Sequence, residues 1–264
     1  MALKERPGVS AQGRLAVLID ADNAQAAGVD ELFVEVARYG VATIKRAYGD
    51  WTTPNLQGWK EVLHRMAVHP VQQFRYTTGK NATDSALIID AMDVLHSGLV
   101  DGFCIVSSDS DFTRLATRIR EAGLVVYGFG QRHTPGPFVA ACDKFVYTEI
   151  LSNRAAEQAP AEAPALPKLK PMVLTALEAT AREDGWALLS ALRSQLNRNH
   201  PAFDPRNYQC EKMGELMRKQ TYLEVKEVPA GEGNGSVHLF VRRRQNGGAQ
   251  PCRNPLGKLE SDPI

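Results

Sequence analysis

The sequence has little that would place the chain in a membrane or a secretory compartment. No apolar run approaches the roughly 18 consecutive residues that are needed to cross a bilayer. The first residues, MALKERPGVSAQGR, lack the apolar centre of a secretory signal peptide. We therefore expect a cytoplasmic protein with no membrane partner.

Cysteine is scarce and scattered. The four cysteines, at positions 104, 142, 210 and 252, form no C-x-x-C pair, which argues against a zinc knuckle and a disulfide framework and favours reduced thiols. The six histidines show no metal-ligand spacing either. The segment GKNATD (79–84) is too loose for a phosphate-binding P-loop, so hydrolysis of nucleoside triphosphates is not expected.

The net charge of +1 conceals an asymmetry between two parts of the chain. Residues 1–150 hold 15 Lys/Arg against 17 Asp/Glu, whereas residues 168–244 hold 13 against 9 and end in three consecutive arginines. An acidic cluster in one module and a basic surface in another suit a nuclease joined to a nucleic-acid-binding domain.

The first part of the chain alternates between strand-like and helical patterns. Apolar runs such as RLAVLID (14–20), VATIKRAYG (41–49), GFCIVSS (102–108) and LVVYGFG (124–130) are separated by segments with helical periodicity. This alternation predicts an α/β fold with a parallel, Rossmann-like sheet flanked by helices. Its ligand site should lie beyond the carboxyl ends of the strands, near the point where the strand order reverses.

A second, smaller domain is expected after an Ala/Pro-rich linker at 152–170. Residues 171–244 contain three helical patterns, the last at 204–220, followed by two strand patterns around the glycine-rich turn PAGEGNG (229–235). Three helices and a hairpin predict a winged-helix α+β domain. Residues 245–264 are expected to be a disordered tail.

Acidic residues gather where strands of the first domain end. Asp20 and Asp22 close the run LIDADN with Asn23 beside them, and Asp109 and Asp111 follow the later run GFCIVSS. Because the carboxyl ends of parallel strands meet at one edge of a sheet, we expect these acids to converge.

A further acid, Asp84, belongs to a predicted helix over about residues 81–97. At 100° per residue Asp84 shares the apolar stripe of this helix and should face the sheet. Asp90 and Asp93 lie about 120° and 180° from it and are interpreted as solvated. Three elements would thus bring carboxylates to one sheet edge.

Crowded carboxylates repel one another and raise each other's pKa unless a cation neutralises them. Their hard oxygen ligands favour Mg²⁺ or Mn²⁺. Such an ion can lower the pKa of a bound water and neutralise charge on a phosphoryl group, while the neutral Asn23 could orient the water. The chemistry indicated is hydrolysis of a phosphodiester.

Simpler interpretations stand beside this one. Asp109 could be a plain helix N-cap, and Asp84 could be a capping-box acid with Asn81 three residues before it. Ser107 and Ser108 could hydrogen-bond the metal-holding residues or merely belong to a polar turn.

Basic and aromatic residues are predicted on the same sheet edge. Lys45, Arg46 and Lys80 could hold phosphates, and Tyr48 and Trp51 could stack on a base. The alternative for each of them is a solvated rim, with Tyr48 partly buried.

Three ordered segments resemble the motifs of the NYN domain, a PIN-like ribonuclease family that includes the LabA-like bacterial proteins. These are LIDADN (18–23), KNATDSALIIDAMD (80–93) and IVSSDSDFTRL (105–115), and the resemblance covers residues 12–151. It implies a parallel PIN-like sheet and a Mg²⁺-dependent nuclease site. Carried over by motif, the metal-binding acids would be Asp20, Asp84 and Asp109, with Asn23 and Asp111 as further catalytic residues; Asp22 stands where the family also has glycine.

Residues 171–244 resemble an OST-HTH domain, also called LOTUS, through LLSALRSQLNRNHPAFDPRNYQCEKMGELMRK (188–219) and the closing VHLFVRRR. Gln209 stands where the family pattern has glycine. The resemblance implies binding of single-stranded or structured RNA, including G-rich RNA, and also protein partners. The alternative for its polar residues is that they keep an amphipathic helix soluble. The candidate RNA contacts are Arg206, Asn207, Tyr208, Lys212, Arg218, Lys219, Arg242, Arg243 and Arg244.

Together these features predict a metal-dependent endoribonuclease tethered to an RNA-binding winged helix, which would hold substrate near the acids. One rival is a haloacid-dehalogenase-type phosphatase, because Asp20-x-Asp22 follows the first strand. It is disfavoured by the missing hydroxyl residue after Asn23. The other rival is a non-catalytic RNA-binding scaffold.

Overall fold

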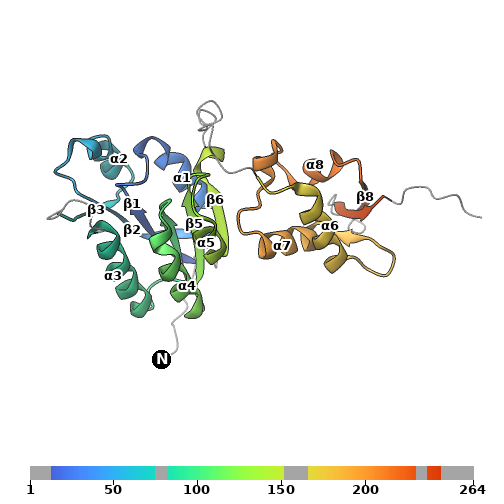
Figure 1. Cartoon of the computed structure of the whole chain (residues 1–264), viewed down its shortest axis with the longest axis horizontal. Helices are drawn as coiled ribbons and strands as arrows, with labels where there is room; N and C mark the ends of the chain where they lie inside the picture. The colour runs from blue at the N-terminus through green and yellow to red at the C-terminus, as the bar shows by residue number, and fades with distance from the viewer. Residues whose placement is uncertain (1–12, 75–81, 152–165, 230–236, 245–264) are drawn as a thin grey trace, which may run out of the picture.

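A computed structural model describes residues 13–74, 82–151, 166–229 and 237–244 of the chain. These residues form an α/β domain followed by a smaller domain of helices and short strands (Figure 1). Among them, no helix is both long and apolar enough to cross a membrane. Cys104, Cys142 and Cys210 are buried free thiols, and Cys252 lies outside the described residues.

A six-stranded parallel sheet forms the centre of the first domain, so the predicted sheet is confirmed. Its order is β3-β2-β1-β4-β5-β6, and every neighbouring pair is parallel. The chain moves outward in one direction from β1 and then in the other from β4, which places the switch point between β1 and β4. The strands are β1 Arg14–Asp20, β2 Val41–Gly49, β3 His69–Gln72, β4 Gly102–Val106, β5 Val125–Gly130 and β6 Lys144–Tyr147.

Helices cover both faces of this sheet (Figure 1). Side chains alternate along each strand, so Leu18 of β1 packs on one side and Val17 and Ile19 on the other. The two resulting cores explain why the strands read as nearly continuous apolar runs. One face carries α3 Ala82–Ser97, α4 Thr113–Glu121 and α5 Gly136–Ala141, and the opposite face carries α1 Val29–Val36 and α2 Trp59–Arg65.

A polar contact fastens α3 to the sheet. The Arg46 guanidinium and the Tyr48 hydroxyl of β2 both donate hydrogen bonds to the Asp90 carboxylate. The interpretation of Asp90 as a solvated acid is therefore wrong. Helical periodicity shows only how far Asp90 lies from the apolar stripe, and it cannot show that a long arginine side chain reaches there from β2.

The second domain has its own core. A three-stranded sheet in the order β7-β9-β8, antiparallel throughout, packs on helices around Val173, Leu192 and Val241. This confirms a small α+β domain, while the glycine-rich turn predicted at 229–235, apart from Pro229, and the tail at 245–264 lie outside the described residues. The elements are α6 Leu169–Thr180, β7 Ala187–Leu188, α7 Leu189–Asn199, α8 Met213–Arg218, β8 Leu223–Pro229 and β9 Val237–Arg243.

The third helix of this domain is shorter than the pattern over 204–220 predicts. A 3-10 turn at Pro205–Tyr208 and the helix α8 replace it, because Gln209 adopts a left-handed conformation with φ of 58°. A continuous helix cannot pass through a left-handed residue. The glycine expected at position 209 would adopt this conformation without steric cost.

The two domains contact one another through a buried carboxylate. Glu35 of α1 is 3% exposed and accepts hydrogen bonds of 2.9 and 3.0 Å from the Arg206 guanidinium of the second domain. Arg206 is held in turn by Asp204 at 2.9 Å. The backbone N–H of Phe145, in β6, donates to the Pro201 carbonyl oxygen. The second domain therefore lies against the β6 side of the sheet.

Candidate active site

The first acid of the site, Asp20, ends β1 and is fully buried. Its Oδ2 accepts hydrogen bonds from the Asn23 amide at 2.7 Å and from the Ser107 hydroxyl at 2.8 Å. Its Oδ1 is buried and has no hydrogen-bond partner among the described residues. Burial outweighs the two donors and raises the pKa of Asp20 above its ordinary value.

The end of β4 supplies a second pair of acids on a tight turn. Asp109 caps the short 3-10 turn at Ser110–Phe112, with its Oδ1 accepting the Asp111 backbone N–H at 2.9 Å. The Ser107 hydroxyl joins this turn to Asp20, since it also accepts the Asp109 N–H at 3.1 Å. Asp109 is thus the predicted N-cap, but capping occupies only one of its two oxygens.

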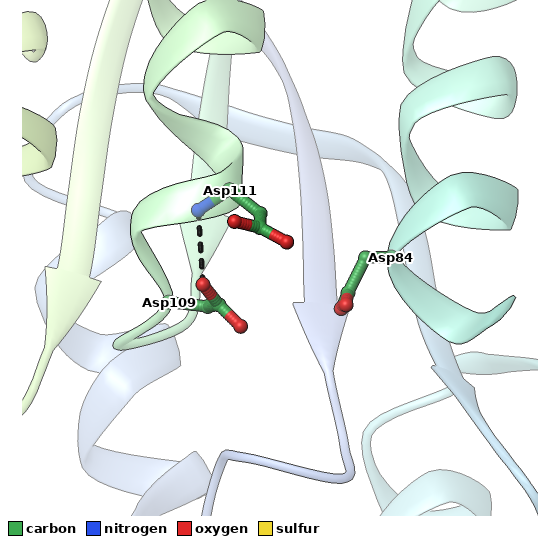
Figure 2. Close-up of side chains that lie close together, drawn as sticks. All are labelled: Asp84, Asp109 and Asp111. Atoms are coloured by element: carbon green, nitrogen blue, oxygen red, sulfur yellow. Dashed lines mark hydrogen bonds between the residues drawn. The ribbon is translucent and has the colours of Figure 1, made fainter. Parts of the chain in front are cut away.

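Figure 2 shows Asp84, from the first turn of α3, pointing toward Asp109 and Asp111 across the switch point. One carboxylate oxygen from each of these three residues lies within 4.8 Å of the other two. Asp84 is 9% exposed, as its place on the apolar stripe predicts. Burial, followed by the nearby charges of Asp20 and Asp109, raises the pKa of Asp84 to about 6.

Hydrogen bonds of Thr83 and Ser108 hold the loops around the acids together. Asp22 accepts a hydrogen bond from the Thr83 hydroxyl at 2.8 Å, which joins the loop after β1 to the first turn of α3. No motif in the sequence predicts a role for Thr83, although its place directly before Asp84 is a usable signal. The Ser108 hydroxyl accepts the Gln131 N–H at 2.9 Å and so holds the turn after β4 to the end of β5.

The donor set fits a hard divalent cation. Carboxylate oxygens are the preferred protein ligands of Mg²⁺, and opposite ligands at about 2.1 Å from the ion stand about 4.2 Å apart. The oxygens of Asp84, Asp109 and Asp111 are close to that spacing at 4.8 Å or less. The orphaned Oδ1 of Asp20 and the raised pKa of Asp84 both indicate a cluster that lacks positive charge. The structure therefore groups Asp84 and Asp109 with Asp111, and places Asp20 beside them.

The basic and aromatic residues predicted on this edge are mostly engaged in the fold. Lys45 donates to the Met66 carbonyl, Arg46 pairs with Asp90, and Tyr48 is fully buried. The Trp51 indole donates to the Val71 carbonyl at 3.0 Å. Lys80 lies outside the described residues. Their suggested role in holding RNA stays a prediction, and Tyr48 is more deeply buried than the sequence analysis expects.

The predicted RNA contacts of the second domain fall into two groups. Arg206 bridges the domains, Asn207 is buried with its amide on the Ala202 carbonyl, and the half-buried Tyr208 donates to the Pro167 carbonyl. The remaining residues lie closer to solvent, although some have acidic partners: Lys212 is exposed, Arg218 pairs with Glu227, Lys219 with Glu215, Arg242 with Glu224, and Arg243 and Arg244 are exposed.

A parallel six-stranded sheet with carboxylates at its switch point is an α/β fold of the PIN-like type. Residues 14–151 match the NYN domain family, and residues 164–234 match the OST-HTH/LOTUS domain. The chain belongs to the NYN family and carries a C-terminal OST-HTH/LOTUS domain, so both predicted resemblances are confirmed. The NYN domain belongs to a nuclease superfamily, and the OST-HTH/LOTUS domain indicates RNA binding.

Solved structures are similar to parts of this chain. A crystal structure of a protein of unknown function from Vibrio parahaemolyticus is 21% identical, with a TM-score of 0.43, and the match covers 53% of this chain and 95% of that one. A solution NMR structure of part of a protein from Chromobacterium violaceum is 34% identical, with a TM-score of 0.26, over 33% of this chain and 92% of that one. No curated protein matches the chain significantly.

Proposed function

We propose that this chain is a metal-dependent endoribonuclease whose OST-HTH/LOTUS domain binds the RNA that the NYN domain cuts. The observation that carries this proposal is the convergence of Asp84, Asp109 and Asp111 beside buried Asp20 at the switch point of the sheet. Gathering like charges costs free energy in the absence of a cation, and a bound divalent cation would offset that cost.

The carboxylates of Asp84, Asp109 and Asp111 would hold Mg²⁺ or Mn²⁺. When bound, such an ion supplies Lewis-acid activation of water and neutralises negative charge that develops on the phosphate. The buried carboxylate of Asp20 adds a further negative charge beside this cluster, and the hydrogen bonds that its Oδ2 accepts from Asn23 and Ser107 would hold it in place.

The hydrogen bonds around Asp20 fix the positions of the acids before substrate arrives. The Ser107 hydroxyl joins Asp20 to the turn that carries Asp109, and the Asp90 contact with Arg46 and Tyr48 anchors the helix that carries Asp84. Carboxylates held in this way need little reorganisation to bind a cation and a phosphodiester. Asn23 is exposed, so its amide could also orient a water or a phosphate oxygen.

The second domain would raise the local concentration of RNA at these acids. Its basic side chains would bind phosphates, so affinity for RNA should fall as salt rises. This division of labour accounts for the opposite charge of the two parts of the chain.

The test is cleavage of labelled RNA and DNA, single and double stranded, by the full chain with Mg²⁺ or Mn²⁺. Asp109→Asn and Asp84→Asn should each lower the rate by at least about 100-fold, because each removes a charged ligand at unchanged size. Asp93→Asn is the matched control, since Asp93 lies on the same helix as Asp84 but is exposed. It should cut like the wild type.

Two outcomes would overturn the proposal. If the wild-type chain cuts no nucleic acid, or if Asp109→Asn cuts as fast as Asp93→Asn, the acids do not serve hydrolysis. RNA binding without any cleavage would then support the alternative of a non-catalytic scaffold.

A further inference from the structure

The outer face of the small sheet in the second domain carries cations and aromatic rings. Lys226 lies opposite Phe240, and Val225 lies opposite Val241, which is fully buried in the domain core. Side chains alternate along a strand, so Lys226, Phe240 and Arg242 point to the face away from the core.

The rings hold these cations in place. The Lys226 Nζ lies 4.1 Å from the centroid of the Trp186 ring, and the Arg242 Cζ lies 4.6 Å from it. The Arg182 Cζ lies 5.5 Å from the Phe240 centroid on the same face. Trp186 is only 8% exposed, so its ring supports the two cations from below and is not itself an open stacking surface.

A basic groove adjoins this face. A cavity of about 530 Å³ lies between α6 and the end of β9, and Arg242 lines it as well as contacting Trp186. Four basic side chains line the groove, Lys170 and Arg242 to Arg244, against the two acids Glu178 and Asp184. The excess of positive charge favours an anionic ligand.

An aromatic side chain forms part of the groove wall. Tyr222 lines the cavity, its hydroxyl is buried without a hydrogen-bond partner among the described residues, and Lys170 lies 5.3 Å from its ring centroid. Burial raises the pKa of Tyr222 to about 12, so this hydroxyl keeps its proton at neutral pH. Clustered cations beside an aromatic wall are typical of surfaces that hold single-stranded nucleic acid.

The helix α8 is a poorer candidate for the same role. Arg218 pairs with Glu227, and Lys219 pairs with Glu215 at 2.7 Å. Acids thus pair with two of the predicted RNA contacts on this side. At the groove Glu224 pairs with Arg242 in the same way, whereas Arg243 and Arg244 are exposed and have no ion pair among the described residues.

We propose that single-stranded RNA binds in the groove between α6 and β9, with its phosphates on Arg242 and Arg243, and that Trp186 is a positioning residue for Arg242 and Lys226. This proposal rests on the RNA-binding role proposed above for the second domain. Of the RNA contacts predicted in the second domain, it selects Arg242 and Arg243 over those near α8.

The test is binding of a labelled single-stranded RNA of about 12 nucleotides to the full chain, followed by fluorescence anisotropy at several salt concentrations in EDTA. The double variant Arg242→Ala/Arg243→Ala is compared with Lys212→Ala/Lys219→Ala on the α8 side. Both lose two positive charges, so a difference between them reports where the RNA lies. Circular dichroism checks that each variant is folded.

The groove variant should lose at least about tenfold in affinity, and its salt slope should fall by about 1.4, or about 0.7 for each lost phosphate contact. The α8 variant should lose less than about twofold. Equal losses in the two variants, or a larger loss in the α8 variant, would overturn the proposal.

Trp186 is tested by two substitutions. Trp186→Phe keeps a ring beneath the cations and should bind RNA within about threefold of the wild type, whereas Trp186→Leu should lower both affinity and salt slope. A folded Trp186→Leu variant with the wild-type salt slope would contradict the positioning role.

Cleavage is measured separately, with Mg²⁺ and RNA at a concentration well below saturation. The groove variant should then cut more slowly by about the factor that it loses in affinity, while Asp109→Asn binds RNA but does not cut. A chain that binds through the groove yet never cuts would end the nuclease proposal and leave this one standing. A chain that cuts while the groove variant binds normally would do the reverse.

Discussion

The two domains place their charged side chains in opposite ways. In the first domain Asp20, Asp84, Asp109 and Asp111 gather at one sheet edge, and the pKa of Asp84 rises to about 6. In the second domain cations are spread out and held by rings or by acids, as Arg242 is by Trp186 and Glu224. Charges that are paired within the protein stabilise its structure, whereas like charges left together indicate a ligand of opposite charge.

The largest expected effect concerns the ion pair that joins the domains. Arg206→Ala would leave the Glu35 carboxylate, 3% exposed, with Arg38 and Tyr39 as its remaining side-chain partners among the described residues. Removing one partner of a buried pair costs about 3 kcal/mol, so urea unfolding should shift to lower concentration by that free energy. The double variant Glu35→Gln/Arg206→Gln should cost less than the two single changes added together, because neither charge is then left alone.

An unchanged unfolding midpoint in Arg206→Ala would show that the domains do not depend on this contact. Arg206 would then stabilise only the turn of the second domain through its pair with Asp204, and not the contact with α1.

The second-largest effect is expected in the pH dependence of stability that the clustered acids produce. Since the pKa of Asp84 is about 6 in the folded protein and 3.8 ordinarily, the folded state binds the additional proton. The metal-free protein should be more stable near pH 4 on this account and should lose that stability as the pH rises through about 6. Asp84→Asn should abolish this dependence and raise the stability of the metal-free protein at neutral pH by about 1 kcal/mol, after allowance for solvent screening.

Unfolding in EDTA at the two pH values measures this directly, and Asp93→Asn is again the control. With Mg²⁺ added, the wild type should instead be more stable than Asp84→Asn at neutral pH, because only the wild type gains the full binding energy of the ion. A wild type whose stability is the same with and without Mg²⁺ at both pH values would contradict the metal site.

Each domain contains a non-glycine residue with a left-handed backbone conformation, so the two sites can be compared directly. Ala67 in the first domain and Gln209 in the second both adopt left-handed conformations, with φ of 50° and 58°. Glycine has no Cβ to clash there, so Ala67→Gly and Gln209→Gly should each stabilise the protein by up to about 1 kcal/mol. Thermal unfolding of the two variants measures the gain. A loss at either site would mean that the greater freedom of glycine in the unfolded chain outweighs the relief of strain.

The smallest effect is expected at an exposed ion pair. Arg218 and Glu227 have side chains that are 50% and 57% exposed, so Arg218→Ala should change the free energy of unfolding by less than about 0.5 kcal/mol. Set beside Arg206→Ala, this variant separates the effect of burial from that of pairing. A loss as large as that of Arg206→Ala would remove the distinction between the two pairs.

The sequence is sufficient to predict the parallel sheet and to predict that the acids lie at the carboxyl ends of its strands. Continuous apolar runs identify buried strands, and an acid directly after such a run must lie at the strand's carboxyl end, as Asp20 and Asp109 do. Asp84 was placed on the inner face of its helix by periodicity alone, and it is 9% exposed.

Contacts between distant residues could not be predicted in the same way. Nothing in the local pattern relates Glu35 to Arg206, which are 171 positions apart, and a basic residue in an RNA-binding domain is naturally interpreted as an RNA contact. Asp90 was misinterpreted for the same reason, since its partners Arg46 and Tyr48 come from another strand. Periodicity describes one element at a time, whereas these bonds depend on how elements pack.

The hydrogen bond from the Phe145 N–H to the Pro201 carbonyl oxygen has one more consequence. The strand β6 is one of the two edge strands of the sheet, and an uncovered edge strand offers unpaired backbone groups to any other strand that approaches. The second domain covers part of this edge. Besides binding RNA, it would therefore protect the first domain from edge-to-edge aggregation, and a chain cut between the domains should be more prone to self-association.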